Sequence, residues 1–273
     1  MRESRHTYCR TTLNYESENG PVPVETDILN GRPTMEELTW EQCGFELIQH
    51  TSDVSNWWDE GEIERIHYDE IETLARRLTS CDHVLFYPAI HRSEAMAKKH
   101  PDFAPIQFVH SDYTESYGEM IKDPDHPYRA IFEPFMARAG ISNKNIRDAT
   151  RVVTLQFWRN IGPALPDFPI GFCDCRTVAR EDLTPVLLTE YGGVRTEFEV
   201  FAVSRPNFEG QHRWYTFPAL TEDEVVVFRT YDSARVALKK PFWTLHSAFR
   251  DTNLSADAPA RQSVELRAIC LFH

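Results

Sequence analysis

Two of the His-x-Asp tripeptides in this chain are candidates to hold a metal ion through their residue types and spacing. One contains His67 and Asp69, and the other contains His110 and Asp112. An imidazole and a carboxylate two positions apart can bind one cation only if both side chains project from the same side of the backbone. Positions i and i+2 share a face in a strand, whereas in a helix they point to different sides. The local secondary structure therefore decides which pair could chelate.

The two tripeptides have different surroundings. His67 and Asp69 lie within residues 60–79, where apolar residues recur at three- to five-residue intervals, as on one face of a helix. His110 and Asp112 follow the extended apolar run IQFV, which predicts the end of a strand. We therefore predict that the second pair binds a metal and that the first does not.

A third ligand must come from a distant part of the chain, because two ligands do not hold a catalytic metal. Two histidines and one carboxylate on one side of an iron(II) ion leave positions open for a cosubstrate and oxygen, as in non-haem iron oxygenases. The histidines of the C-terminal half are His212, His246 and His273. The apolar and aromatic run before His246 favours it, and His212 is the alternative.

A carboxylate-binding pair follows His246 after fifteen and seventeen residues, as Arg261 and Ser263. Both stand at the start of a predicted strand and, two positions apart, share one face. A guanidinium beside a hydroxyl is suited to bind a carboxylate through charge-assisted hydrogen bonds. The spacing fits one strand, a turn and a returning strand, which would bring Arg261 near the metal. A surface arginine at a strand edge is the alternative.

The elements that must position these residues change character along the chain. We expect strands at 44–50 and 83–90, a helix at 60–79 and two short helices within 113–139 that end at Gly140. After Arg151 six β-branched and aromatic runs are separated by turn residues: RVVTLQFWRNIG, PIGFCDC, VRTEFEVFAVS, HRWYTFP, EVVVFRTYD and QSVELRAICLFH.

These elements predict a mainly β fold with flanking helices. We expect a double-stranded β-helix (jelly roll) core with helices packed outside it; an α+β domain with one open antiparallel sheet is the alternative. The whole chain, 1–273, is expected to form a single oxygenase domain. It would consist of an N-terminal arm (1–45), a helix-rich part (46–140) and the main β-core (141–273).

Composition and charge limit the classes of binding partner and the cellular location that the sequence predicts. The net charge of −13 disfavours nucleic acid and anionic membranes, since both require basic patches. No run reaches membrane-spanning length, and the first residues lack the apolar core of a secretory signal. The six cysteines form no CxxC pair, which indicates reduced thiols and a cytoplasmic protein; Cys173 and Cys175 could alternatively bind a soft metal. A homodimer is left open.

The order HxD, a distant His, then RxS resembles the iron(II)/2-oxoglutarate-dependent dioxygenase superfamily. More specifically, the chain is similar to the CmcJ/NvfI-like group, also described as aspergillic-acid hydroxylase/desaturase-like, whose members are largely tailoring oxygenases of fungal secondary metabolism. The similar stretches run from about residue 40 to the end: CGFELIQHTSDV, HSDYT, LQFWRNIGP, GFCDCRTV, HRWYTFPALTEDEVVVFRTYDS, LHSAFRD and ADAPARQSVELRAICLF.

The resemblance implies roles for individual residues. They are, position by position, the iron ligands His110, Asp112 and His246, the 2-oxoglutarate anchors Arg261 and Ser263, and the substrate-binding residues Trp158 and Arg159 of the shared motif QFWRN. For Arg159 a structural ion pair is the alternative.

The implied activity is that of a non-haem Fe(II) enzyme with 2-oxoglutarate and O2 as cosubstrates. Such a dioxygenase would tailor a small natural product by hydroxylation, desaturation, or oxidative ring or endoperoxide formation. The alternatives are an iron oxygenase that does not use 2-oxoglutarate, a cupin-type isomerase or hydrolase with another divalent metal, and a non-catalytic jelly-roll binding protein. Some aromatic residues of the β-rich half could line an apolar substrate pocket, although a place in the core is the more common outcome for each: Phe157, Trp158, Trp214, Tyr215 and Trp243.

Overall fold

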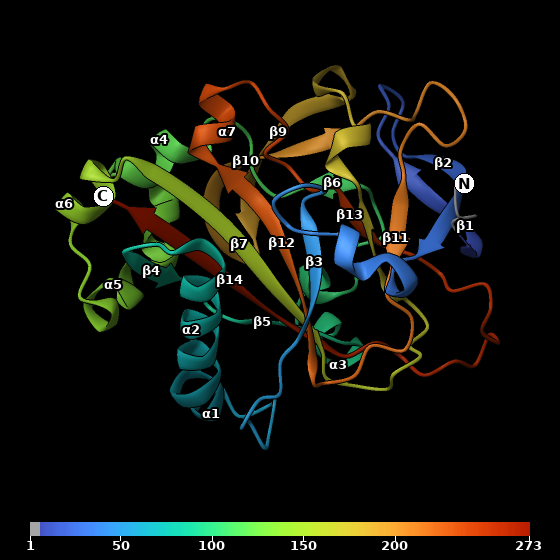
Figure 1. Cartoon of the computed structure of the whole chain (residues 1–273), viewed down its shortest axis with the longest axis horizontal. Coiled ribbons are helices and arrows are strands. Elements are labelled where there is room, and N and C mark those ends of the chain that lie inside the picture. The colour runs from blue at the N-terminus through green and yellow to red at the C-terminus, as the bar shows by residue number, and fades with distance from the viewer. Residues whose placement is uncertain (1–5) are drawn as a thin grey trace.

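Two β-sheets form the centre of the structure, a computed structural model that describes residues 6–273 (Figure 1). The larger sheet has eight strands in the order β1-β2-β11-β8-β13-β6-β10-β9. Its strands are β1 (Thr7–Tyr15), β2 (Val22–Asn30), β11 (Trp214–Thr216), β8 (Ile170–Cys173), β13 (His246–Ala248), β6 (His110–Ser111), β10 (Val194–Val203) and β9 (Leu183–Tyr191).

The second sheet is built on two long antiparallel strands, β7 and β14. Their register places Gln156 opposite Arg267 and Trp158 opposite Glu265. The sheet order is β3-β12-β7-β14-β4, and β5 also pairs with β14. The strands are β3 (Phe45–Gln49), β12 (Glu224–Asp232), β7 (Arg151–Asn160), β14 (Ser263–Phe272), β4 (His83–Phe86) and β5 (Ile90–Arg92).

A continuous helical segment covers the outer face of the second sheet. It consists of α1 (Glu60–Glu62), the π-helical turn η2 (Ile63–His67) and α2 (Tyr68–Thr79), and it lies beside β14 and β7 in Figure 1. Leu74 of α2 belongs to the same buried cluster as Leu155 of β7. The predicted helix at 60–79 is confirmed, because its regularly spaced apolar face packs on the sheet.

The remaining helices are short and lie outside the sheets. α5 ends at Gly140, as predicted, where a φ of +64° requires the left-handed region that glycine adopts without strain. The helices are α3 (Glu94–Ala97), α4 (Tyr117–Lys122), α5 (Glu133–Ala139), α6 (Asn143–Asp148) and α7 (Ser233–Ala237).

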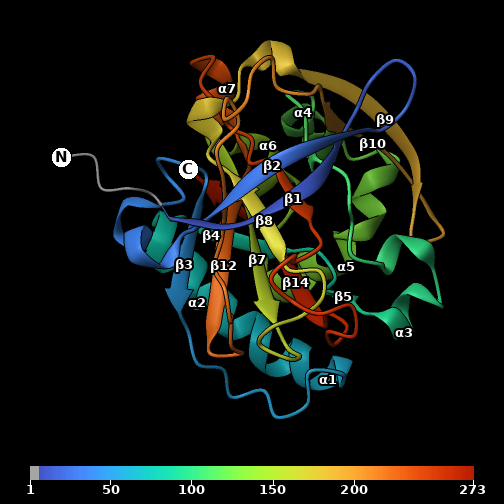
Figure 2. The same ribbon diagram turned by 90° about the vertical axis from the view of Figure 1, so that its right-hand side faces the viewer.

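The inner faces of the two sheets pack against each other. The ring of Phe228 in β12 lies 4.7 Å from that of His246 in β13 and 5.0 Å from that of Phe172 in β8, measured between ring centroids. Figure 2 shows β1 and β2 crossing in front of these strands. The space between the sheets is therefore where side chains from distant parts of the chain meet.

The predicted β-runs are all present, as β7, β8, β10, β11, β12 and β14. Within the segment expected to be the N-terminal arm, residues 7–30 form β1 and β2, an antiparallel pair that joins the larger sheet because β2 pairs with β11. β9 was not predicted, since its residues are mostly exposed and do not alternate cleanly between apolar and polar.

Candidate active site

His110, Asp112 and His246 meet on the inner side of the larger sheet. β6 and β13 are adjacent antiparallel strands, and their register sets His110 directly opposite His246. Each histidine Nε2 lies 3.8 Å from Asp112 Oδ1. Within residues 6–273 this is the one set of His, Cys, Asp or Glu side chains whose ligand atoms all lie within 4.8 Å of one another. One divalent ion could bridge them.

The backbone holds the other nitrogen of each imidazole. His110 Nδ1 lies 2.9 Å from the Phe108 carbonyl, and His246 Nδ1 lies 3.0 Å from the Thr244 carbonyl. A carbonyl only accepts, so each Nδ1 donates its proton and each Nε2 lone pair is left facing Asp112. Burial and the adjacent His246 lower the pKa of His110 to about 3, although Asp112 acts in the opposite direction. This is the tautomer and charge state of a metal-binding histidine.

The two oxygens of Asp112 have different partners. Oδ2 accepts a hydrogen bond of 3.0 Å from Arg267 of the facing sheet, while Oδ1 faces the imidazoles. Burial raises the pKa of Asp112, but Arg267 and the two histidines outweigh that effect and lower the pKa to about 2. The carboxylate is therefore ionised at neutral pH. Imidazoles bind a metal in their neutral form, so with the carboxylate the three residues would supply a ligand set of charge −1, which suits a divalent cation.

Arg261 and Ser263 lie where β14 begins, and both are buried, with 3% and 0% of their surface exposed. Arg261 Nη1 donates to the Phe168 carbonyl at 3.3 Å. Its Nε and the Ser263 hydroxyl have no hydrogen-bond partner in the described chain, where no ion pair includes Arg261. Burying such groups unpaired is unfavourable. A ligand carboxylate would satisfy both.

Trp158 and Arg159 lie on opposite faces of β7. Trp158 is buried on the inner face, where the Arg261 guanidinium lies 5.7 Å from its ring centroid. Arg159 points outward and donates to the backbone carbonyls of His50 and Glu222. Because consecutive strand residues face opposite ways, the structure does not bring Arg159 to the candidate site. Its hydrogen-bond partners are these two carbonyl groups and the Nδ1 atom of His50, rather than the carboxylate of the alternative ion pair.

His212 lies apart from the three ligands. Its Nδ1 is 3.1 Å from the Tyr15 hydroxyl, and its Nε2 is 3.2 Å from Asp182 Oδ2. Both ring nitrogens are thus engaged in a separate buried contact. The structure brings His246, not His212, to His110 and Asp112.

The first His-x-Asp pair is held in helical backbone, as predicted. His67 is buried in η2, with its Nδ1 3.4 Å from Glu70. Asp69 points to solvent and pairs with Arg138 at 3.0 Å. The two side chains therefore serve different contacts and do not converge on one point.

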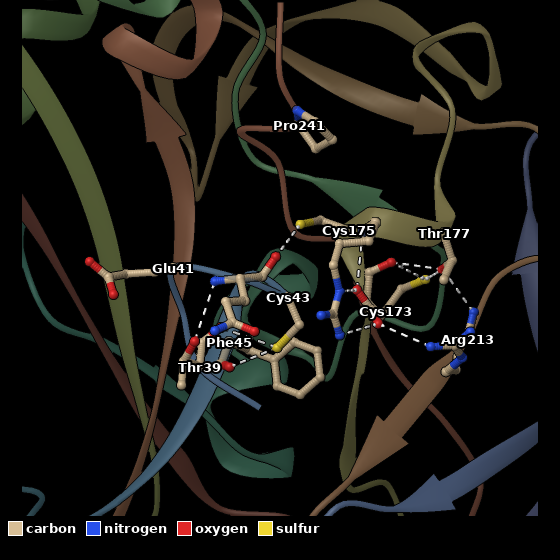
Figure 3. Close-up of polar contacts among 12 residues, drawn as sticks. Thr39, Glu41, Cys43, Phe45, Cys173, Cys175, Thr177, Arg213 and Pro241 are labelled. Carbon is tan, nitrogen blue, oxygen red and sulfur yellow. Dashed lines mark hydrogen bonds and ion pairs between the residues drawn. The ribbon is translucent and has the colours of Figure 1, made fainter. Parts of the chain in front are cut away.

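The cysteine-rich region was the other metal candidate. Figure 3 shows Cys43, Cys173 and Cys175 in separate polar contacts. Cys43 Sγ donates to the Thr39 carbonyl at 3.2 Å, and Cys175 Sγ donates to the Gln42 carbonyl at 3.5 Å. Burial raises the pKa of all three thiols. Protonated, carbonyl-bound thiols are poor metal ligands, so the structure gives no support to a soft-metal site at Cys173 and Cys175.

A cavity of about 1120 Å³ opens beside the three ligands. His110, Asp112 and Arg267 form part of its wall. The rest of the wall is mostly apolar and comes from residues 87–109, the 3-10 helix η4 (Pro127–Ile131), β9 and β10. Its apolar residues include Ile90, Met96, Ile106, Phe108, Ile131, Val186, Leu188, Val194, Phe198 and Val200.

The cavity lining separates the two alternatives for the aromatic residues of the β-rich half. They are buried core residues, the more common outcome, and are not part of this wall: Phe157, Trp158, Trp214, Tyr215 and Trp243. The apolar pairing of β9 with β10 forms much of the wall instead. The apolar residues of the run LTPVLLTEY could have indicated a strand, but the run contains no motif that links it to a binding site. Sequence reasoning also missed Arg267, which stands four residues after Ser263.

Comparisons with known proteins agree on one family. A model of the family described as "Oxidoreductase/YMDC permease-like domain" matches residues 3–271. No helix of residues 6–273 combines the length and apolar character needed to cross a membrane.

Named relatives are fungal proteins. The chain is 27% identical over 216 residues to the Fe(II)/2-oxoglutarate-dependent dioxygenase nvfI of Aspergillus novofumigatus (strain IBT 16806), covering 77% of this chain and 68% of that protein. It is 26% identical over 296 residues to the hydroxylase/desaturase efuI of Hormonema carpetanum, covering 100% and 90%. The solved structure of the iron and alpha-ketoglutarate-dependent endoperoxidase NvfI has a TM-score of 0.79 at 21% identity, covering 97% and 98%, and so shares the fold.

Proposed function

Because the chain belongs to the oxidoreductase/YMDC permease-like family and, within it, to the NvfI-like group, we propose that His110, Asp112 and His246 hold the iron of an iron(II)/2-oxoglutarate-dependent dioxygenase. The enzyme is an oxidoreductase with Fe(II) as cofactor and 2-oxoglutarate and O2 as cosubstrates. It tailors a small natural product by hydroxylation, desaturation, or oxidative ring or endoperoxide formation. One observation carries the site: two backbone-held imidazoles aim Nε2 at one carboxylate oxygen.

Arg261 and Ser263 are proposed to anchor the far carboxylate of 2-oxoglutarate. The guanidinium Nε and the hydroxyl are both buried and without partners among the described residues. Burial lowers the pKa of Arg261 to about 10, with Glu265 acting in the opposite direction. The residue therefore remains a cation at neutral pH. Binding a carboxylate would replace the hydration that Arg261 lost on folding with charge-assisted hydrogen bonds.

The chain's contribution to the reaction is binding and placement. Bound iron with 2-oxoglutarate and O2 supplies the oxidant that removes hydrogen from a substrate C–H bond. Three protein ligands on one side leave the other positions free for the cosubstrates. The apolar cavity would hold the substrate carbon beside the metal and exclude bulk water from it. Which product forms depends on how that cavity orients the carbon after it has lost its hydrogen.

We also infer features of the wider protein. The two facing sheets support the double-stranded β-helix (jelly roll), with helices outside. A small molecule is the proposed substrate, and the net charge of −13 argues against nucleic acid. The six free, buried cysteines support a cytoplasmic location. A homodimer is compatible with these features, and no observation argues for it.

Anaerobic spectroscopy tests the proposed site. Adding Fe(II) and then 2-oxoglutarate to the purified protein should produce a weak visible charge-transfer band, because the keto acid must chelate the iron. The band should be absent from His110→Ala. Iron binding without the band would favour an oxygenase that does not use 2-oxoglutarate. No iron binding at all would favour a non-catalytic jelly-roll protein.

A further inference from the structure

A buried chain of hydrogen bonds runs from Asp112 across the inner face of the second sheet. Arg267 donates through Nη2 to Asp112 Oδ2 at 3.0 Å and through Nε to the Gln156 Oε1 at 2.8 Å. The Gln156 amide nitrogen donates to Glu265 Oε2 at 2.8 Å. The other Glu265 oxygen accepts from Arg92 Nε at 2.5 Å. Each member of the chain thus fixes the next.

The backbone explains why these groups meet. Glu265 and Arg267 are two positions apart on β14 and face the interior together, while Gln156 stands opposite Arg267 on β7. The chain ends at the cavity wall, where Arg92 donates to the Asp102 and Ala104 carbonyls and to the Tyr191 hydroxyl. All three guanidinium nitrogens of Arg92 are engaged in these contacts.

The aromatic surroundings restrict Arg267 further. Its guanidinium carbon lies 5.2 Å from the ring centroid of Tyr113 and 5.7 Å from that of Tyr87. Attraction between a cation and two aromatic faces favours one placement of the guanidinium. Arginine stays protonated in proteins, so the cation facing Asp112 is permanent.

We propose that Arg267 is a positioning residue that occupies Asp112 Oδ2 and so makes Asp112 a one-oxygen ligand. This rests on the proposed iron site. With Oδ2 taken, only Oδ1 is available to the metal. A carboxylate that rotated or bound through both oxygens would take a position that 2-oxoglutarate or O2 needs. Gln156 and Glu265 hold the Arg267 fork in the orientation that this task requires.

The test measures metal affinity without turnover. The purified full chain is titrated anaerobically with Co(II), a stand-in for iron(II), and binding is followed by visible absorption. Arg267→Met should weaken Co(II) binding roughly 10- to 100-fold, the usual loss when a partner of a metal ligand is removed. Arg267→Lys should restore part of this, since one ammonium can neutralise Asp112 but cannot also hold Gln156 in the same geometry. Gln156→Leu should weaken binding roughly 3- to 10-fold.

Arg159→Met is the matched control. Arg159 is a buried arginine of the same sheet on its opposite face, so its loss should lower the melting temperature and leave Co(II) affinity unchanged. Wild-type affinity in both Arg267→Met and Gln156→Leu would overturn the proposal. So would unchanged Co(II) affinity with a raised KM for 2-oxoglutarate, which would make Arg267 a cosubstrate contact. If the wild type itself binds no Co(II), the iron site fails and the positioning role with it.

Discussion

The His-x-Asp pairs at positions 67/69 and 110/112 have the same residue types but different structural roles. His110 and Asp112 extend from a strand end toward the facing sheet, and their ligand atoms lie 3.8 Å apart. His67 and Asp69 lie in helical backbone, where one side chain is buried and the other exposed. The difference teaches that the period of the backbone, not the residue types, makes such a pair a chelate.

A second contrast concerns the two faces of the six-stranded sheet. The outer face is largely apolar and packs on α2, and its buried Arg159 donates to backbone carbonyls. The inner face carries the buried residues Arg261, Glu265 and Arg267, of which Arg267 contacts Asp112 and forms part of the cavity wall. Charged groups are buried at a large desolvation penalty unless they are paired. Their concentration on the inner face therefore indicates that this face serves binding rather than apolar packing.

The largest effect is expected from substitutions in the pair at the strand end, His110 and Asp112. His110→Ala should abolish iron retention and succinate formation, because two remaining ligands cannot hold a catalytic ion. His67→Ala should keep both. Iron content by colorimetric assay and succinate by chromatography measure these outcomes. A His110→Ala protein that retains one iron per chain and full turnover would remove this pair from consideration.

The third ligand sharpens the contrast between a histidine that faces the other two candidate ligands and one that does not. His246→Ala should lose iron. His212→Ala should retain it but melt earlier, since Asp182 and Tyr15 lose a buried partner. The reverse pattern of iron content in the two variants would show that the assignment of His246 is mistaken.

Arg261→Ala should raise the KM for 2-oxoglutarate roughly 30- to 1000-fold. A charge-assisted pair to a carboxylate contributes about 2–4 kcal/mol when it is lost from a buried site. Steady-state succinate formation against 2-oxoglutarate concentration measures the shift. Arg159→Ala, on the outer face, is the control and should leave this KM unaltered. An unchanged KM in Arg261→Ala would mean that the anchor lies elsewhere.

The buried helical histidine should make the fold sensitive to acid. Burial lowers the pKa of His67 to about 4, and the hydrogen bond to Glu70 offsets this only in part. The unfolded chain takes up this proton first, near pH 6.5. Stability from His67 is thus complete above pH 6.5 and falls, by at most roughly 3 kcal/mol, as the pH approaches 4. Urea unfolding at pH 7.5 and 4.5 should show a smaller difference for His67→Leu; an identical difference would contradict the assignment.

The smallest effect is expected at Asp69. Its side chain is 74% exposed, and its ion pair with Arg138 is at the surface. Asp69→Ala should change the free energy of unfolding by less than about 1 kcal/mol and leave iron content intact. Urea titration measures the first and the iron assay the second. Loss of iron in this variant would contradict the prediction that the pair 110/112 binds the metal and the pair 67/69 does not.

Local periodicity accounts for what could be predicted. A strand places His110 and Asp112 on one face, the recurring apolar residues of 60–79 make a helix, and β-branched runs make strands such as β7 and β14. These features depend on residues close together in sequence. They were sufficient to select the chelating pair and to set aside the helical one.

The rest depended on contacts between distant residues. Asp112 and Arg267 are 155 positions apart, and no local pattern indicates that a guanidinium will occupy one oxygen of that carboxylate. The same holds for the cavity, whose wall joins residues near 90–109 to β9 and β10. Strand order and register determine which distant residues come into contact, and both depend on the packing of whole sheets. The sequence pattern by itself therefore determined which residues could bind a metal ion. The tertiary structure determined which groups hold those residues and which groups they face.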